Sequence, residues 1–437
     1  MPPALTFRTA LRYWLKLGFV SFGGPAGQIA MMHAELVERR RWISERRFLH
    51  ALNYCMLLPG PEATQLAVYI GWLLHRTAGG IAAGVLFVLP SLLILIGLSW
   101  VYMAWGHLPA IAGIMNGIKP AVVAIVLGAA WRIGSRTIRN WLLAAIAACA
   151  FVAIAVLELP FPLIVLAAAL AGLAGGRLRP ALFDLGAAHA AAHISYGPAL
   201  IDDDTPTPPH ARFSWAGLVR VTLIGCGLGL AAWLLLAALY GPSSALARMG
   251  WFFTKCAMMT FGGAYAVLPY VVQGAVEHYG WLSASQMIDG LALGETTPGP
   301  LIMIVAFVGF VGGWTHALFG PGALFAAGAA GATVATVFTF LPSFVFILAG
   351  GPLVESTRGN VRMTAPLTAI SAAVVGVIGS LAVFFGGHVF LAGGRPQWPA
   401  IAIGLAASIA VLRYKVGTIP LILACAMAGL VLSYWHV

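Results

Sequence analysis

One pattern of residues occurs twice in this chain of 437 residues, and the repeat limits the architectures open to it. Phe22-Gly23-Gly24, Trp42 and Pro59-Gly60-Pro61 recur as Phe261-Gly262-Gly263, Trp281 and Pro298-Gly299-Pro300. All three features are displaced by 239 positions (for example, 261 − 22), with no insertion or deletion between them. Two hydrophobic halves that each carry an interrupted helix pattern are typical of secondary transporters, whose substrate site lies between the repeats.

The composition places the chain in a membrane. It is 61% hydrophobic and 8% charged, whereas about 25% of the residues in a soluble domain are charged. A helix of about 20 apolar residues can cross a bilayer. Apolar runs of at least that length cover 79–105, 109–131, 141–176, 215–240, 320–349, 363–388 and 398–435. The runs 141–176 and 398–435 are long enough for helical hairpins, with breaks expected at Pro160-Phe161-Pro162 and around Arg413. We therefore predict an all-α polytopic membrane protein.

Lysine and arginine gather in a few short loops, which the positive-inside rule assigns to the cytoplasm. These loops contain Arg39-Arg40-Arg41 with Arg46-Arg47, Arg132 to Arg139, Arg177 and Arg179, Arg358 and Arg362, and Arg413 and Lys415. The repeat counterpart of the first loop, 277–286, contains neither lysine nor arginine. The two halves are therefore predicted to be inverted-topology repeats, each with broken or re-entrant helices. Ordinary full-length helices kinked at Gly or Pro are the alternative that the loop charges leave open.

One polar stretch separates the two halves. We predict an N-terminal repeat over 1–176, a cytoplasmic linker over 177–214 and a C-terminal repeat over 215–437. The linker contains Asp202-Asp203-Asp204 and a Thr/Pro-rich run, and both are typical of a solvated, partly extended connector. Because the acidic triplet has no spaced fourth ligand, we interpret it as a solvated loop and not as a metal site.

The two Pro-Gly-Pro motifs predict helix breaks inside the membrane. Proline lacks an N–H group and fixes φ, so a helix cannot continue through Pro59-Gly60-Pro61, and a new helix is expected to begin near Pro61. Irregular backbone at membrane depth occurs where it is buried in protein or lines a wet cavity. The freed N–H groups at a helix start are a natural oxyanion site. A structural kink is the alternative, but two copies beside intramembrane acids and hydroxyls favour a binding site.

The paired glycines predict a second part of the same site. They allow close backbone approach and leave amides free to face a ligand, although small residues also serve helix packing in membranes. Ser21 and Thr260 place a hydroxyl before each pair. The candidate substrate-binding residues drawn from both motifs and their neighbours are Ser21, Gly23, Gly24, Pro59, Gly60, Pro61, Thr64, Gln65, Lys255, Thr260, Gly262, Gly263, Thr296, Thr297, Pro298, Gly299 and Pro300.

Four ionisable residues flank these motifs. Lys16 and Lys255 are counterparts in the repeat; Lys16 is read as a snorkelling residue, and Lys255 as a candidate half of a cationic funnel. Glu62 and Glu295 each lie within three residues of a Pro-Gly-Pro motif, and an intramembrane acid is a functional candidate by default. Each acid is a candidate for proton coupling, for gating by pairing with a cation, or for capping the broken helix.

No metal-type His or Cys spacing, P-loop or nucleophile–base arrangement occurs in the sequence. We therefore expect neither an enzyme nor a cofactor, and no energy supply from ATP. No nucleic-acid partner is expected, because the net charge of +11 is concentrated in the membrane-flanking loops.

With these motifs in place, the chain resembles the chromate ion transporter family, of the long, two-domain ChrA type. The resemblance covers nearly the whole chain and is strongest from Phe22 to Pro90 and from Phe261 to Gly313. The family's acidic and polar companion residues fall on Glu35, Glu38, Asn53, Glu62, Gln65, Glu295 and Thr297, which adds Asn53 to the candidate binding residues. The resemblance implies chromate efflux across a bacterial inner (cytoplasmic) membrane, chromate resistance, and sulfate as a competing analogue.

Energetics is consistent with export. A dianion leaving a cell that is negative inside gains about 2.3 kcal/mol per charge per 100 mV, so export needs no coupled ion and proton antiport is allowed but not required. A sulfate or other oxyanion permease of the same fold is the alternative, followed by an anion channel and a membrane-embedded enzyme. We expect a homodimer, because small inverted-repeat transporters are often dimers.

Overall fold

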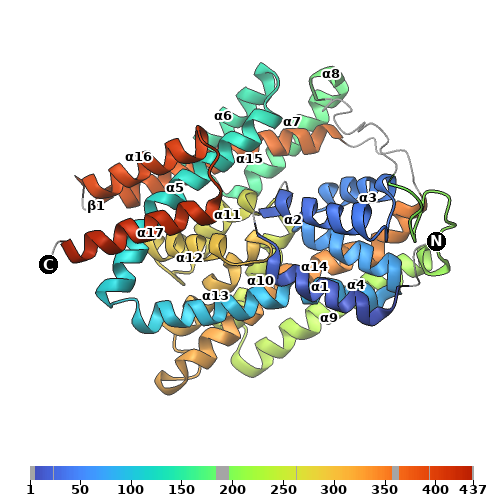
Figure 1. Ribbon diagram of the computed structural model, residues 1–437, viewed down its shortest axis with the longest axis horizontal. Coiled ribbons are helices and arrows are strands. Elements are labelled where there is room, and N and C mark those ends of the chain that lie inside the picture. The colour runs from blue at the N-terminus through green and yellow to red at the C-terminus, as the bar shows by residue number, and fades with distance from the viewer. Residues whose placement is uncertain are drawn as a thin grey trace.

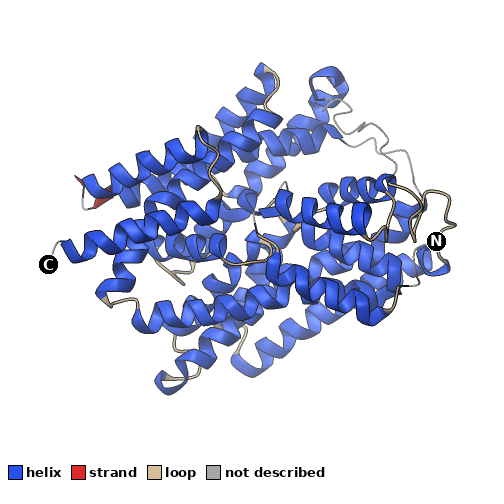
Figure 2. Ribbon diagram, in the orientation of Figure 1, coloured by secondary structure: helices blue, strands red, loops and turns tan. Residues whose placement is uncertain are grey.

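The computed structural model describes residues 5–22, 24–183, 196–261, 263–356, 364–392 and 394–435. Apart from one hairpin of two short strands, β1 (Leu391–Ala392) and β2 (Arg395–Pro396), the regular elements of these residues are helices (Figure 2). Six of them are long and apolar enough to cross a membrane: α4 (Glu62–Trp105), α5 (Pro109–Thr137), α7 (Phe161–Leu178), α9 (Trp215–Tyr240), α14 (Leu324–Ser356) and α15 (Thr364–Phe390). The predicted all-α polytopic membrane fold is confirmed.

Both predicted helical hairpins are present. The first consists of α6 (Trp141–Ala155) and α7, which begins directly after Pro160. The second consists of α16 (Trp398–Leu412) and α17 (Thr418–Trp435), separated at Arg413 to Gly417. Proline at the start of α7 supplies the φ that a first helical turn needs and lacks only an N–H that would have no partner there. Both hairpins pack against α5 or α15 (Figure 1).

The sequence repeat is also a repeat of helical elements. The first half opens with α1 (Phe7–Val20), α2 (Gly24–His33), a π-helical turn η1 (Ala34–Arg39) and α3 (Glu45–Leu57). The second half has their counterparts in α10 (Ala245–Met258), α11 (Ala264–Val272), η3 (Gln273–His278) and α12 (Ala284–Thr296). Both π-helical turns, and both α3 and α12, are displaced by the same 239 positions as the motifs.

Identical local chemistry explains these matching boundaries. Ser44 and Ser283, at equivalent positions, are the N-caps of α3 and α12, and each side chain accepts the N–H three residues ahead. A hydroxyl in that position satisfies one of the unpaired amides of the first turn. After each π-helical turn, the N–H of Trp42 donates to the carbonyl of Leu36, and that of Trp281 to Ala275.

The helices that carry the glycine and proline motifs are too short to cross a bilayer. α1, α3 and α12 have 14, 13 and 13 residues, whereas about 20 are needed. In Figure 1, α3 lies at the end of the molecule that holds the N-terminus, and α12 lies toward the end that holds the C-terminus. This arrangement favours broken helices over full-length kinked ones, while the orientation of each half in the membrane stays a prediction.

α4 and its counterpart in the second half differ by an insertion. Within α4 the helix is interrupted at His75 and Arg76, whose φ/ψ angles are non-helical. In the second half, η4 (Leu301–Met303) and α13 (Ile304–Thr315) are separated from α14 by a loop and by η5 (Pro321–Ala323). Leu89-Pro90-Ser91 and Leu341-Pro342-Ser343 therefore stand 252 positions apart (341 − 89) and not 239.

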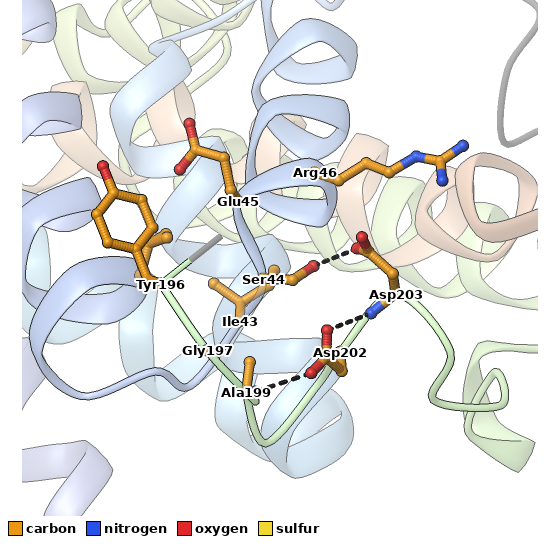
Figure 3. A pocket seen from close by; sticks show the side chains of 10 residues that line it. Ile43, Ser44, Glu45, Arg46, Tyr196, Gly197, Ala199, Asp202 and Asp203 are labelled. Atoms are coloured by element: carbon orange, nitrogen blue, oxygen red, sulfur yellow. Dashed lines mark hydrogen bonds between the residues drawn. The ribbon is translucent and has the colours of Figure 1, made fainter. Parts of the chain in front are cut away.

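Part of the polar linker packs against the first half. Residues 184–195 lie outside the described residues, and the linker also holds α8 (Pro180–Phe183) and η2 (Pro209–Ala211). Ile201 forms a parallel bridge with Ile43, and the Ser44 hydroxyl donates to Asp203 Oδ1 at 2.6 Å (Figure 3). Asp202 accepts the N–H groups of Ala199 and Asp203. Residues 199–205 therefore pack along the loop before α3 and satisfy its backbone groups, while Asp203 and Asp204 are exposed.

Candidate functional site

Each Pro-Gly-Pro loop contacts the Phe-Gly-Gly loop of the opposite half. The N–H of Gly60 donates to the carbonyl of Thr260 at 2.7 Å, and the N–H of Gly299 donates to the carbonyl of Ser21 at 2.8 Å. Gly60 and Gly299 are repeat counterparts, and so are Ser21 and Thr260. Each of the two hydrogen bonds is therefore the counterpart of the other in the repeat. We call these four loops, 21–24, 59–61, 260–263 and 298–300, the crossed loops.

The two central glycines cannot be replaced without strain. Gly60 and Gly299 have φ angles of 125° and 109°, a conformation that L side chains rarely adopt. A Cβ on Gly60 would lie 2.3 Å from Ser343 Oγ, and one on Gly299 would lie 2.7 Å from Ser91 Cβ. The serine of each Leu-Pro-Ser motif thus packs against the Pro-Gly-Pro glycine of the opposite half.

Sequence reasoning missed Ser91 and Ser343 as site residues. The signal was present, since Leu-Pro-Ser is a third repeated motif, but its different offset separated it from the others. Both serines are buried, on α4 and α14. They extend the candidate site from the crossed loops to the long helices α4 and α14.

Buried polar atoms without a partner gather around the crossed loops. Among the described residues, these include the hydroxyl oxygens of Ser21, Thr64 and Ser91 and the amide oxygens of Gln28 and Gln65, and all five side chains are buried. Most buried polar groups in proteins are hydrogen-bonded, because leaving one unpaired costs about 1–3 kcal/mol. Three unpaired hydroxyl groups are donors that a tetrahedral oxyanion can use.

Two glutamines hold the Pro-Gly-Pro loops in place. Gln65 Nε2 donates to the carbonyl of Pro59 at 2.7 Å and to Ser343 Oγ at 3.4 Å. Gln28 Nε2 donates to the carbonyl of Gly299 at 2.6 Å and to that of Ser21 at 3.5 Å. Gln65 was a predicted site residue. Gln28 was not, because its repeat counterpart is Val267 and it belongs to no motif.

The predicted threonines fall into two groups. The Thr260 hydroxyl donates to the carbonyl of Cys256 at 2.7 Å, and the Thr296 hydroxyl to that of Leu293 at 2.9 Å. The Thr297 hydroxyl also donates to the Leu293 carbonyl. These three protons are engaged at helix ends, whereas the Thr64 hydroxyl, in the first turn of α4, is unpaired. Among the predicted threonines, Thr64 is therefore the one whose hydroxyl proton is available to a ligand.

The two predicted acids are held differently. Glu62 is the first residue of α4, is half-buried, and has no hydrogen-bond partner among the described residues, which suits a carboxylate at the positive end of a helix. Glu295, in the last turn of α12, accepts the hydroxyl of Tyr265 of α11. Arg132 of α5 interacts electrostatically with both Tyr265 and Glu295. Tyr265 was not predicted, because its repeat counterpart is Ala26.

Other predicted residues lie apart from the crossed loops or are used in another way. Asn53 is exposed on α3, and Lys255 is half-buried with its Nζ 5.9 Å from the ring centroid of Trp251.

Gly23 and Gly262 lie outside the described residues. Gly24 and Gly263 both have a positive φ with open space at the Cβ position. Pro59, Pro61, Pro298 and Pro300 flank the two central glycines. The amides of Gly60 and Gly299 are engaged across the halves and do not add to the free amides expected at the helix starts and the paired glycines.

The acidic companions near the first loop serve its structure. Glu35 accepts a hydrogen bond from Arg40 at 2.7 Å and from Arg39 at 3.4 Å, and the adjacent guanidinium of Arg40 lowers the pKa of the Glu35 carboxyl. Glu38 contacts His33 at 3.1 Å. These contacts order the turn between α2 and α3.

Comparison with known proteins places the chain in a family. It matches the chromate transporter family over residues 9–173 and 247–430. It is 32% identical to the chromate transport protein of Pseudomonas aeruginosa, over 98% of this chain and 93% of that protein. The identity is 28% to the chromate transport protein of Cupriavidus metallidurans (98% and 94%) and 27% to the probable chromate transport protein of Synechococcus elongatus (99% and 97%). No solved structure matches. The chain belongs to the chromate transporter family.

Proposed function

We propose that this protein is a secondary transporter that exports chromate across the bacterial cytoplasmic membrane, driven by the membrane potential, by proton antiport or by both, and that it confers chromate resistance. The observation that carries the proposal is the pair of reciprocal hydrogen bonds at the crossed loops, surrounded by unpaired buried hydroxyls. The names of the full-length relatives support chromate as the substrate.

The chemistry of the crossed loops suits a tetrahedral oxyanion. Chromate offers only hydrogen-bond acceptors, so its site needs donors. The hydroxyls of Ser21, Thr64 and Ser91 are unpaired donors, and the first-turn amides of α4 have no intrahelical acceptor. These neutral donors bind a dianion without placing a fixed positive charge at the crossed loops.

The connection between the halves supports inverted topology. The family match is interrupted between 173 and 247, and the only candidate span among the described residues of that interval is α9. No residue of α9 is buried, as expected of a helix at the lipid-facing periphery that packs on one side against α14 and α10. When a unit begins and ends on the same side of the membrane, as the positive charges predict here, one crossing between its two copies places the second upside down relative to the first. The reciprocal bonds at the crossed loops are those that such an arrangement would produce.

Flux driven by an imposed membrane potential tests the proposal. In inverted vesicles, we expect labelled chromate to accumulate when the lumen is positive. At 100 mV, two charges contribute about 4.6 kcal/mol, which corresponds to a ratio of roughly 10³ at equilibrium. Accumulation under a pH gradient alone, lost in Glu62→Gln or Glu295→Gln, would assign proton antiport instead. Absence of flux under either gradient would contradict the proposal.

Competition separates chromate from its closest analogue. We propose sulfate as a competing substrate, because both are tetrahedral dianions. If labelled sulfate is transported and chromate is not, the protein is a sulfate permease of the same fold, and uptake against the potential would then require a coupled ion.

The structure ranks the threonines by their expected effect on transport. Thr64→Val keeps the shape but removes an unpaired hydroxyl donor, so we expect the KM for chromate to rise about tenfold or more, the equivalent of one hydrogen bond to a charged group. Thr297→Val should have a smaller effect, because that hydroxyl already donates to a carbonyl. The control is Thr333→Val, on an exposed face of α14. Equal KM values for all three variants would remove Thr64 from the site.

A further inference from the structure

A second group of buried ionisable side chains lies away from the crossed loops. Asp289 of α12 is only 3% exposed, and its Oδ2 accepts the Tyr102 hydroxyl at 2.8 Å. Lys119 Nζ of α5 lies 3.6 Å from the same oxygen. Asp289 Oδ1 is buried and has no hydrogen-bond partner among the described residues. Charges buried in a membrane protein are costly and usually mark a path for ions.

Lys119 also reaches a cavity. This cavity, with a volume of about 400 Å³, lies between α5, α12 and the C-terminal hairpin. Lys119, Asn116, Ser285, His388 and Gln397 line it. Lys119 is the one lysine or arginine among the described lining residues, and none of those residues is acidic. The cavity therefore offers several hydrogen-bond donors and one positive charge, at Lys119, on a lining that is otherwise mostly apolar.

Helix α12 connects the cavity to the crossed loops. Ser285, in its first turn, lines the cavity, Asp289 follows one turn later, and Thr296 ends the helix just before Pro298-Gly299-Pro300. At a rise of 1.5 Å per residue, the distance along the helix from Asp289 to Thr296 is about 10 Å. Lys119 thus stands between an open cavity and the proposed central site.

The repeat shows that this charge pair is more than a packing contact. Asp289 corresponds to His50 at the offset of 239, and Tyr102 corresponds to Val354 at the offset of 252. In the first half, His50 Nε2 contacts the carbonyl of Val354 at 3.2 Å. The same two helix positions are therefore in contact in both halves. In the first half the contact joins His50 to a backbone carbonyl, and in the second it joins Tyr102 to Asp289. The counterpart of Lys119 is Ser371, so a lysine is not required for helix packing at this position.

We propose that Lys119 is a second binding site for a small oxyanion dianion, passed between the cavity and the crossed loops. Without the anion, Asp289 holds the ammonium group of Lys119. A dianion in the cavity carries twice the charge of the carboxylate and displaces it, while the Tyr102 hydroxyl keeps its hydrogen bond to Asp289. The inference rests on the proposed function only in naming chromate as the anion. That the ligand is a small oxyanion dianion follows from the cavity itself.

Thiol protection tests the site directly. The reporter is Ser285→Cys, an almost isosteric change at an exposed lining residue, in a full-length protein whose five native cysteines are replaced. The measurement is the rate at which a negatively charged methanethiosulfonate reagent modifies the purified protein in nanodiscs, at increasing sulfate concentration. Sodium chloride at equal ionic strength corrects for screening.

Three backgrounds give the decisive comparison. In the otherwise native background, sulfate should slow modification in a saturable way. In D289N, which removes the competitor, protection should occur at a sulfate concentration about tenfold lower. In K119Q/D289N, which leaves no buried charge unpaired, protection should require a concentration at least tenfold higher. Size-exclusion profiles confirm that each variant is folded.

The results that would overturn the proposal are equally specific. Sulfate protection of equal strength in D289N and K119Q/D289N would show that Lys119 does not bind the anion, and so would absence of protection in the native background. Chromate flux in vesicles is a separate measurement. If that flux is absent while sulfate protects through Lys119, the proposed substrate is wrong and the anion site remains.

Discussion

Alanine at Gly60 or at Gly299 should reduce chromate transport below about a tenth of the wild-type rate. Each glycine has a φ angle that costs an L residue of the order of 1–3 kcal/mol, and each new Cβ would lie within 2.7 Å of a serine of the other half. Relief requires the loop to move, and this movement breaks the hydrogen bond to Thr260 or Ser21. Transport in vesicles, normalised to the amount of folded protein, is the measurement.

The matched control is Gly97→Ala in α4. Gly97 has no atom within 4 Å of the Cβ position and no positive φ, and alanine is a better helix former than glycine. We expect Gly97→Ala to transport at the wild-type rate. Because the two glycines occupy equivalent positions in the crossed loops, G60A and G299A should lower the chromate transport rate to similar extents. A wild-type rate in either one would mean that the crossed loops are not a part of the transport machinery.

Lys119→Met should lower the free energy of unfolding by about 2–3 kcal/mol. Removing one partner of a buried charge pair costs about 3–5 kcal/mol when both groups are buried, and Lys119 retains 20% exposure, which reduces the penalty. The lost partner leaves the Asp289 carboxylate with the Tyr102 hydroxyl as its remaining contact. Equilibrium unfolding in mixed micelles of a mild detergent and dodecyl sulfate measures the change.

A double-mutant cycle separates the charge from the packing. In K119M/D289N, the buried carboxylate is gone, so most of the lost stability should return, and D289N alone should cost less than K119M, since asparagine still accepts from Tyr102. A double variant no more stable than K119M would show that the lysine stem, and not its charge, stabilises this region.

The sequence was most informative where local chemistry decides the structure. The hairpins at 141–176 and 398–435 and the helix break at Pro59-Gly60-Pro61 follow from proline geometry and apolar length, and the structure confirms them. The sequence repeat is matched by equal boundaries of α3 and α12, because Ser44 and Ser283 cap these equivalent helices in the same way.

Contacts between distant segments could not be read from spacing. Nothing local indicates that the Gly60 amide reaches the Thr260 carbonyl, or that Gln28 reaches Gly299. Tyr265 and Gln28 were not predicted as site residues, because their repeat counterparts are different residue types. Asn53 was included through the family resemblance, but the side of α3 on which it lies depends on packing that the sequence does not specify.

The reciprocity of the two glycine hydrogen bonds also bears on the energies of the transport cycle. If the two halves exchange roles, a second conformation arises from the same kinds of backbone contact, since each bond is replaced by its counterpart. Two such conformations are close in free energy, so both are populated, and a ligand needs only a small differential affinity to shift the balance between them. The side chains that break the symmetry, Gln28 and Gln65 among them, then set the resting ratio of the conformations open to either side of the membrane.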